Sequence, residues 1–174
     1  MTATPAADAA TPDIDAFTRP YWTAAAEGRL LVRRCASCSL AHHYPREFCP
    51  YCWSEDVRWE RASGRAVLYT WSVVHRNDLP PFGERVPYVA AVVDLAEGPR
   101  MMTEIVDCVT GELWVGAELE VCFRTGEGIV RGPDHGAPPE YAVPVFRWRG
   151  PSAVPAGDAH GHSNSRTHES PSRR

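Results

Sequence analysis

Two close pairs of cysteines constrain this chain more than any other feature of its sequence. Two residues separate Cys35 from Cys38, two separate Cys49 from Cys52, and ten residues lie between the pairs. A two-residue spacer forms a tight turn that aims both sulfurs at one point, so two such turns supply the four ligands of a tetrahedral site. The spacing therefore predicts one structural Zn²⁺ per chain, bound by Cys35, Cys38, Cys49 and Cys52.

An all-cysteine site leaves no position open for water or substrate, so we expect the metal to stabilise the fold and to take no part in a reaction. The spacing is also compatible with iron, which would indicate electron transfer. The second pair alone resembles a glutaredoxin active site, but its flanks lack the buried strand and helix start that this chemistry needs. His42 and His43 lie between the pairs. We expect them at the ribbon surface or beside the ligands.

Length and composition indicate a globular protein. The chain has 174 residues, of which 44% are hydrophobic and 23% charged, values close to those of soluble domains. Its apolar runs are far shorter than the roughly 20 residues that span a bilayer, and its start lacks the features of a secretory signal. We therefore expect a cytoplasmic protein with no membrane partner, whose cysteines are ligands or core residues and not disulfides.

Hydrophobic patterning and turn signals divide the chain into five segments. They are a disordered N-terminus, a helical segment, a zinc ribbon, a barrel domain and a disordered tail, bounded by 1–12, 13–28, 29–62, 63–149 and 150–174. The two ends hold few large apolar side chains, so burial cannot offset the entropy lost on ordering. In the helical segment Thr18 is the predicted N-cap, Pro20 lies in the first turn and Gly28 ends the helix.

The barrel domain contains five strand candidates separated by turn signals. They cover residues 66–75, 88–95, 100–107, 118–124 and 142–148. Five strands with one long early loop and one later interruption suit a small OB-type barrel, although an incomplete sandwich is the alternative. The predicted fold is thus mainly β, with an N-terminal helix and a four-cysteine zinc ribbon followed by a five-stranded OB-fold barrel.

This order of elements resembles the zinc-ribbon OB-fold family of proteins associated with acyl-CoA metabolism. The similar stretches cover most of the predicted ordered chain, at residues 21–22, 28–38, 44–45, 49–52, 59, 63–64, 87–88, 95–98, 113–121 and 143–146. The resemblance implies a rubredoxin-like ribbon with two N-terminal helices joined to an OB domain. It also implies a small subunit of a thiolase-like or hydratase-like enzyme, on which the partner depends for solubility or activity.

Members of this family are similar in lacking an agreed catalytic residue, and the sequence itself shows no nucleophile with a base and an orienting group nearby. The helix and ribbon of such proteins are thought to lie near the acyl-CoA, with the barrel contacting the partner. Eight of the 17 aromatic residues fall within the first sixty positions, which suggests an interface or an apolar groove. The candidate acyl-CoA or partner contacts are Tyr21, Trp22, Arg29, Arg33, Arg34 and Trp53.

The sequence therefore favours a non-catalytic zinc-binding subunit that binds or positions acyl-CoA for a thiolase-type partner, which would carry out acyl transfer, condensation or retro-aldol cleavage. An accessory subunit of an enoyl-CoA hydratase is one alternative. A second is a module that binds single-stranded nucleic acid, because zinc ribbons and OB barrels both do so elsewhere. Residues 65–149 carry 8 Arg against 12 Asp and Glu, which disfavours nucleic acid. The third alternative is a small enzyme or electron carrier that uses the metal.

Overall fold

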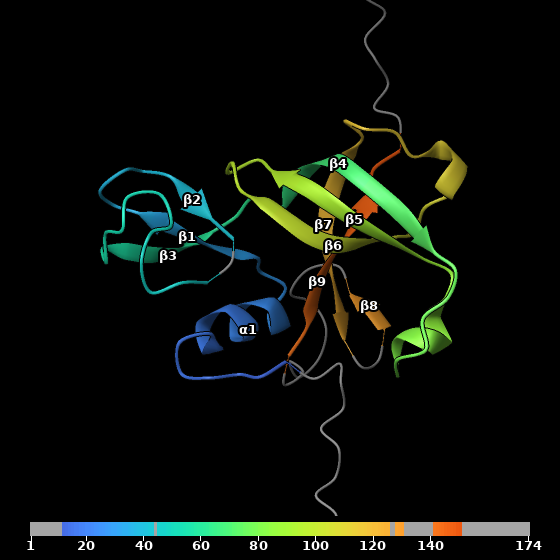
Figure 1. Ribbon diagram of the computed structural model, residues 1–174, viewed down its shortest axis with the longest axis horizontal. Coiled ribbons are helices and arrows are strands. Elements are labelled where there is room, and N and C mark those ends of the chain that lie inside the picture. Colours follow the sequence, from blue (N-terminus) through green and yellow to red (C-terminus); the bar gives the residue numbers. More distant parts are fainter. Residues whose placement is uncertain (1–11, 44, 126–127, 131–140, 151–174) are drawn as a thin grey trace, which may run out of the picture.

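The computed structural model describes residues 12–43, 45–125, 128–130 and 141–150. A small ribbon domain lies at one side, a β-barrel at the other, and one helix runs beside both (Figure 1). The predicted disordered ends, 1–12 and 150–174, lie almost wholly outside the described residues. Within residues 12–43 there is one α-helix, so the two N-terminal helices implied by the resemblance are not both found in this part of the chain.

The helix α1 covers Arg19–Ala26 and buries Tyr21 and three alanines. Pro20 occupies its first turn, as predicted, because the missing N–H of proline has no intrahelical partner at that position. Gly28 follows the C-cap with φ +73°, a left-handed conformation that ends the helix. Small alanines on the buried face let the helix axis approach the barrel closely, and α1 contacts β7 (Glu118–Thr125) and β9 (Val143–Trp148).

Thr18 is the N-cap residue, as predicted, but its side chain caps none of the helical N–H groups. Its hydroxyl instead donates to Asp15 Oδ1 at 2.7 Å and accepts from the Asp15 backbone N–H at 3.2 Å. Asp15 Oδ1 also accepts from the Thr18 backbone N–H at 2.6 Å, and this bond lowers the pKa of Asp15. The reciprocal pattern of a capping box therefore begins three residues before the expected position.

The ribbon contains a three-stranded antiparallel sheet in the order β2-β1-β3. Its strands are β1 (Leu31–Cys35), β2 (Ala41–His42) and β3 (Val57–Arg61). The central strand β1 carries the first cysteine at its end, and Cys35 pairs with Val57 in the register. The sheet thus brings the first cysteine turn to the same end of the ribbon as the start of β3.

The second domain is a closed five-stranded barrel, which confirms the predicted OB fold. Its strands follow the order β4-β5-β6-β9-β7, and β4 also pairs with β7. The first three strands are β4 (Arg65–Val74), β5 (Tyr88–Leu95) and β6 (Arg100–Val106). The pairing of β4 with both β5 and β7 closes the sheet, so the sandwich alternative is wrong. A short strand β8 (Gly128–Val130), which the sequence did not reveal, extends from β7.

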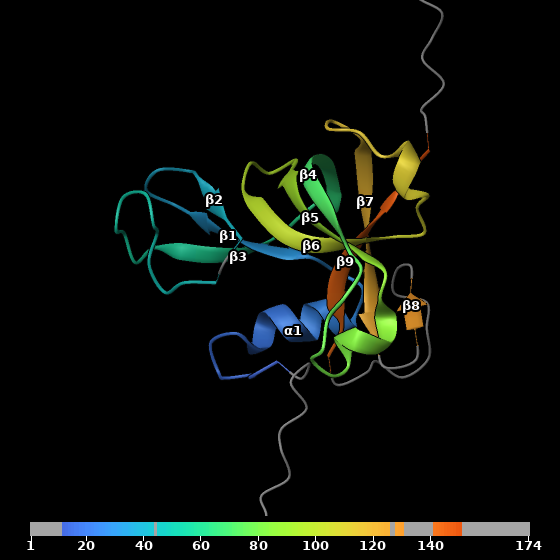
Figure 2. The same cartoon turned by 45° about the vertical axis from the view of Figure 1, so that its right-hand side comes forward.

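Two single-turn helices lie in the loops of the barrel. The helix η1 (Phe82–Arg85) follows β4, and η2 (Thr110–Glu112) follows β6. The segment with η1 lies on the same side of the barrel as α1 in both views (Figures 1 and 2). This loop and α1 therefore flank the same end of the barrel, next to β9.

One apolar core connects the helix, the base of the ribbon and the barrel. Leu30 and Val32 belong to the same cluster as Leu68, Phe123 and Phe146, all of them almost fully buried. The metal end of the ribbon holds a much smaller cluster of its own, made of Cys35, Cys49 and Val57 with Cys38 beside them. This end has too little apolar burial to be stable by itself and needs another source of stability.

Gly64 lies between the ribbon and the barrel in a conformation that few other residues adopt. Its φ is +78°, and an added Cβ would lie 2.5 Å from Val121 Cγ1. Gly64→Ala is expected to lower the free energy of unfolding by about 1–3 kcal/mol, because backbone strain and a steric clash with a stiff β-branched side chain add together. Urea denaturation followed by circular dichroism measures this. Gly111→Ala, which meets no atom within 4 Å, is the control. Equal losses in the two variants would contradict the prediction.

Candidate functional site: a four-cysteine metal centre and an adjacent cleft

The two cysteine turns share one backbone pattern. The Cys35 N–H donates to the Leu40 carbonyl at 3.0 Å, and the Cys49 N–H donates to the Ser54 carbonyl at 2.8 Å. In each turn the residue four positions after the first cysteine has a positive φ, 63° at Ser39 and 62° at Trp53. These two residues donate their N–H groups back to the carbonyls of Cys35 and Cys49 at 3.0 and 2.9 Å. The repeated pattern makes two equivalent turns that face each other.

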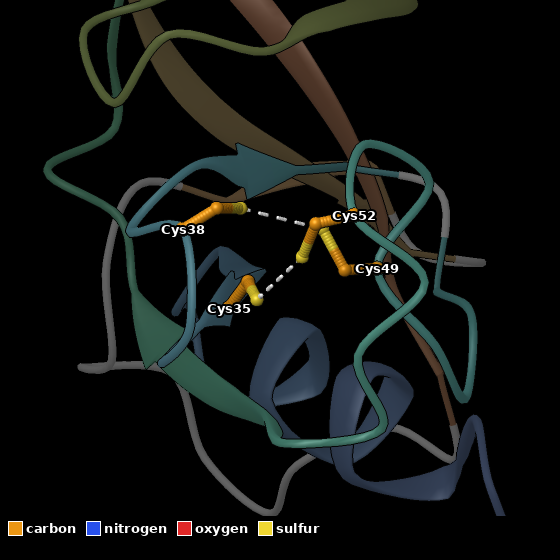
Figure 3. A group of neighbouring side chains, drawn as sticks. All are labelled: Cys35, Cys38, Cys49 and Cys52. Carbon is orange, nitrogen blue, oxygen red and sulfur yellow. Dashed lines mark hydrogen bonds between the residues drawn. The ribbon is translucent and has the colours of Figure 1, made fainter.

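The four sulfurs converge on one point between these turns (Figure 3). All four Sγ atoms lie within 4.8 Å of one another, and the pairs Cys35–Cys52 and Cys38–Cys49 are each 3.6 Å apart. Four sulfurs bound to Zn²⁺ at about 2.3 Å would be about 3.8 Å apart in a tetrahedron. The cysteines therefore fit one structural zinc ion, as the sequence predicted. Bound there, zinc would fix the two turns and take part in no reaction, because no ligand position is left open.

The charges in this cluster also match a cation. The backbone N–H of Cys38 stabilises the Cys35 thiolate and lowers the pKa of Cys35 to about 6. The backbone N–H of Ser54 stabilises a Cys52 thiolate, but burial and the other three cysteines outweigh it and raise the pKa of Cys52 to about 12. Four thiolates at one point repel each other, and a dication removes that repulsion.

The three arginines proposed as ligand contacts have different surroundings. Arg33 is only 7% exposed, donates to the Val57 carbonyl at 3.0 Å and lies over the rings of Phe17 and Trp59 at 5.3 and 4.8 Å. Burial lowers the pKa of Arg33. Arg33 therefore packs between the helical segment and the ribbon. This position does not support a contact with a phosphate.

The other two arginines are partly exposed. Arg34 donates to both carboxylate oxygens of Glu60, at 2.8 and 3.0 Å, and to the Ser39 carbonyl at 2.9 Å. Arg29 pairs with Glu27 at the end of the helix. Arg34 thus braces the first cysteine turn against β3, while Arg29 remains accessible just after the end of α1.

The three aromatic candidates lie in two places. Tyr21 is 6% exposed and packs edge-to-face against Trp22, which is half-buried. Trp53 lies in the second cysteine turn, 74% exposed and stacked on Phe48 at 5.2 Å. Nearby in the sequence, Tyr51 is also exposed. The candidates therefore do not form one site: two belong to the helix and one belongs to the tip of the ribbon.

Tyr21 and Trp22 form one wall of a cleft of about 690 Å³ between α1 and the barrel. Its floor comes from β5 and β6, and its other wall comes from the segment with η1. The face of the second and third strands, between these loops, is the ligand-binding surface of many OB folds. The volume lies within the range of small-molecule sites. Apolar and aromatic lining residues outside the helix include Phe82, Tyr88, Ala90, Met102, Tyr141 and Val143.

Sequence reasoning missed three charged residues in this cleft. Glu104 on β6 accepts two hydrogen bonds from Arg124 on β7, both 2.6 Å long, and Arg85 approaches it to 3.5 Å. All three residues are mostly buried and line the cleft. Ile105, the next residue on β6, is buried, and the two-residue period of a strand is the only local sign that Glu104 faces away from the core. Its pairing with Arg124 depends on the barrel register and has no local signal.

His42 and His43 are less exposed than the sequence predicted. His42 is almost fully buried, and burial followed by the charges of Arg33 and Arg46 lowers its pKa. Nε2 of His43 lies 3.2 Å from the Tyr21 hydroxyl oxygen, and burial lowers the pKa of His43 to about 4. Burial therefore favours the neutral form of both imidazoles, and His43 packs against Tyr21 of the helix.

The lowered pKa of His43 gives a pH-dependent stability. Between pH 6.5 and 4 the unfolded chain binds a proton at this residue and the folded chain does not, so stability falls as pH falls. The change from pH 7.5 to 5.5 is expected to cost about 1 kcal/mol through His43. Urea denaturation at both pH values, with bound zinc measured, tests this. His43→Gln should remove that part of the loss, and His75→Gln should not. An unchanged pH dependence in His43→Gln would contradict the assignment.

The described part of the chain contains no helix long and apolar enough to cross a membrane. Its α-helix, α1, has 8 residues.

Comparison with known proteins agrees with both halves of the structure. Residues 22–58 match the family model described as the ChsH2 rubredoxin-like zinc ribbon domain, and residues 59–124 match the ChsH2 C-terminal OB-fold domain. A solved structure described as "Ltp2-ChsH2(DUF35) aldolase" is similar with a TM-score of 0.63 and 31% identity, over 79% of this chain and 98% of that chain.

Two curated relatives extend this likeness. A probable enoyl-CoA hydratase alpha subunit of Thermomonospora curvata is 32% identical over 127 residues, which are 73% of this chain but 36% of that subunit. This chain thus spans little more than a third of that relative. A DUF35 domain-containing scaffold protein of Methanocaldococcus jannaschii is 37% identical over 96 residues, 55% of this chain and 67% of that protein. The chain therefore belongs to the DUF35 family, in which a ChsH2-type zinc ribbon precedes an OB-fold domain.

Proposed function

We propose that this chain is a non-catalytic zinc-binding subunit of a thiolase-like or hydratase-like enzyme and that it binds or positions the acyl-CoA of that partner. The observation that carries the proposal is the combination of a metal site with all four positions filled by cysteine and a separate cleft with aromatic walls. Such an arrangement suits binding and assembly. The relatives named as a hydratase subunit, a scaffold protein and an aldolase with a DUF35 part support this proposal.

Within the proposed function, the cleft receives the acyl group. Trp22 and Tyr141 face each other edge to face at 6.5 Å, and Met102 on the barrel side is 77% exposed. Aromatic and thioether side chains adapt to apolar ligands of varied shape. Tyr21 and Trp22 are therefore the proposed acyl contacts, and the accessible Arg29 is a candidate contact for the CoA portion.

The tip of the ribbon is the proposed contact with the partner enzyme. Trp53, Phe48 and Tyr51 present aromatic area there, and Trp and Tyr are enriched among residues that dominate binding energy at interfaces. The zinc ion would hold this surface in place, since Trp53 belongs to the second cysteine turn. Loss of the metal should then also lose the partner.

Co-expression with the thiolase-like or hydratase-like enzyme encoded by an adjacent gene, followed by size exclusion, tests this function. The two proteins should elute together. Trp53→Ala should weaken the complex about tenfold or more with zinc retained, and Trp114→Ala, at an exposed tryptophan on the barrel, should not. Separate elution of the wild-type chain from every such enzyme would rule out the subunit function. Equal complexes with both variants would rule out the ribbon tip as the contact.

A further inference from the structure

Three charged residues on the floor of the cleft, Arg85, Glu104 and Arg124, differ in how fully they are hydrogen-bonded. Arg124 uses both terminal nitrogens in two bonds of 2.6 Å to Glu104. Arg85 Nη1 lies 3.5 Å from Glu104 Oε2, which is an ion pair without a hydrogen bond of normal length. Glu104 is thus fully engaged by Arg124, and Arg85 holds only a loose contact.

Arg85 also retains unused hydrogen-bonding capacity. Its Nε is buried and has no hydrogen-bond partner among the described residues. The guanidinium lies over the Phe82 ring at 5.0 Å, so one planar face is supported while its edge stays available. The Arg85 side chain is 30% exposed and lines the cleft, so a terminal nitrogen that holds only the loose contact with Glu104 can reach an acceptor from outside.

The net charge of this group is positive. Two guanidinium groups and one carboxylate leave one positive charge in a cleft whose surroundings are largely apolar. A positive charge with apolar walls attracts a negative group and disfavours a second cation, because opposite charges interact more strongly where water is partly excluded. Planar guanidinium groups bind carboxylate and phosphate oxygens particularly well.

Apolar residues line the cleft beside this charged group. Ala90 and Met102 belong to β5 and β6, where Ala90 pairs with Glu104, and Val143 begins β9. Trp22 and Tyr141, which contact each other edge to face, also line the cleft. The cleft thus combines a cationic group with an apolar surface of small-molecule size.

We propose that this cleft binds an amphipathic anion, with its carboxylate or phosphate oxygens on Arg85 and its apolar body over Ala90, Met102 and Val143. This inference rests on the proposed function in one respect, that the cleft binds a small molecule. It adds the chemical group that the cleft recognises, an anionic head group. Arg85 exchanges its loose contact with Glu104 for the ligand, while the Glu104–Arg124 pair keeps the cleft floor in place. No bond is made or broken.

Isothermal titration of the full, zinc-loaded chain with dodecanoate, dodecyl phosphate and dodecanol tests the proposal. Both anions should bind at least about tenfold more tightly than the alcohol, because a hydrogen bond to a charged group contributes about that much to affinity. Arg85→Met should remove this difference and leave dodecanol binding within about twofold. Arg100→Met is the matched control, since Arg100 lies on β6 outside the cleft and pairs with Asp94. The anion that binds more tightly identifies the head group as carboxylate or phosphate.

A second variant keeps the test decisive if Arg85→Met does not fold. Met102→Glu changes a highly exposed side chain at the cleft, so it should fold and weaken both anions by about tenfold through repulsion. Failure of all three ligands to bind, equal binding of anions and alcohol, or equal losses for all three in Arg85→Met would overturn the inference.

Dodecanoyl-CoA separates this inference from the proposed function. If it binds, but dodecanoate and dodecyl phosphate bind no more tightly than dodecanol, the inference fails while acyl-CoA binding stands, because the thioester carries no free carboxylate. If dodecanoate binds through Arg85 but no partner enzyme co-elutes, the inference stands and the subunit function fails.

Discussion

Cys35→Ser is expected to leave the purified chain without bound zinc and with an unfolded ribbon. Cys35 is fully buried at the end of β1, and its backbone N–H and carbonyl both take part in the first cysteine turn. Structural zinc contributes about 10–16 kcal/mol of apparent free energy in isolated fingers, far more than the three-residue apolar cluster at this end can supply. The wild-type chain should hold one zinc per chain and the variant close to none.

Metal analysis by plasma emission, with amide hydrogen exchange of the ribbon strands, measures both effects. Cys108→Ser is the control, because Cys108 is partly buried against the barrel core and lies outside the metal cluster. It should keep its zinc. The proposed partner enzyme should also bind wild type but not Cys35→Ser, since the ribbon tip loses its support. A Cys35→Ser protein that stays folded and metal-bound would contradict the structural assignment of the zinc.

Phe146→Ala is expected to have the largest effect on the barrel. Phe146 is fully buried on β9, where it pairs with Ile105 on β6 and with Val121 on β7. Removing a buried phenylalanine ring costs about 3–5 kcal/mol, because transfer free energy is lost and a cavity remains. Whole domains are stable by only about 5–15 kcal/mol, so this variant should be close to unfolding at physiological temperature.

Urea denaturation followed by circular dichroism gives the loss directly, provided that the denaturant slope is unchanged. Val143→Ala, on the same strand but exposed, should change the free energy of unfolding by no more than about 0.5 kcal/mol. If the two variants lose equal stability, the closed barrel is not centred on Phe146 as described.

The local patterns in the sequence were sufficient for the zinc site and the order of elements. Cysteine spacing alone located the four ligands, because each turn forms within six residues. Alternation of apolar residues located the five barrel strands to within one or two residues; β5, for example, begins at Tyr88 and ends at Leu95 as predicted. These features depend on neighbours in the chain, which a sequence displays directly.

Features that depend on distant contacts were missed. Arg33 was predicted to be a ligand contact, but it lies on the same face of β1 as Leu31 and Cys35 and is enclosed by Phe17 and Trp59. Only the two-residue period of the strand hinted at this position. The contact between Glu104 and Arg124 joins residues 20 positions apart on strands separated by β9. Nothing in either local sequence specifies that contact.

Turnover of acyl-CoA by the proposed partner enzyme, measured with each protein alone and with both together, tests the proposed function most directly. A non-catalytic subunit should give no turnover by itself. It should raise the activity or the soluble yield of the partner, and Cys35→Ser should abolish this effect. Acyl-CoA turnover by the zinc-loaded chain alone, at a rate that scales with its concentration, would contradict the account.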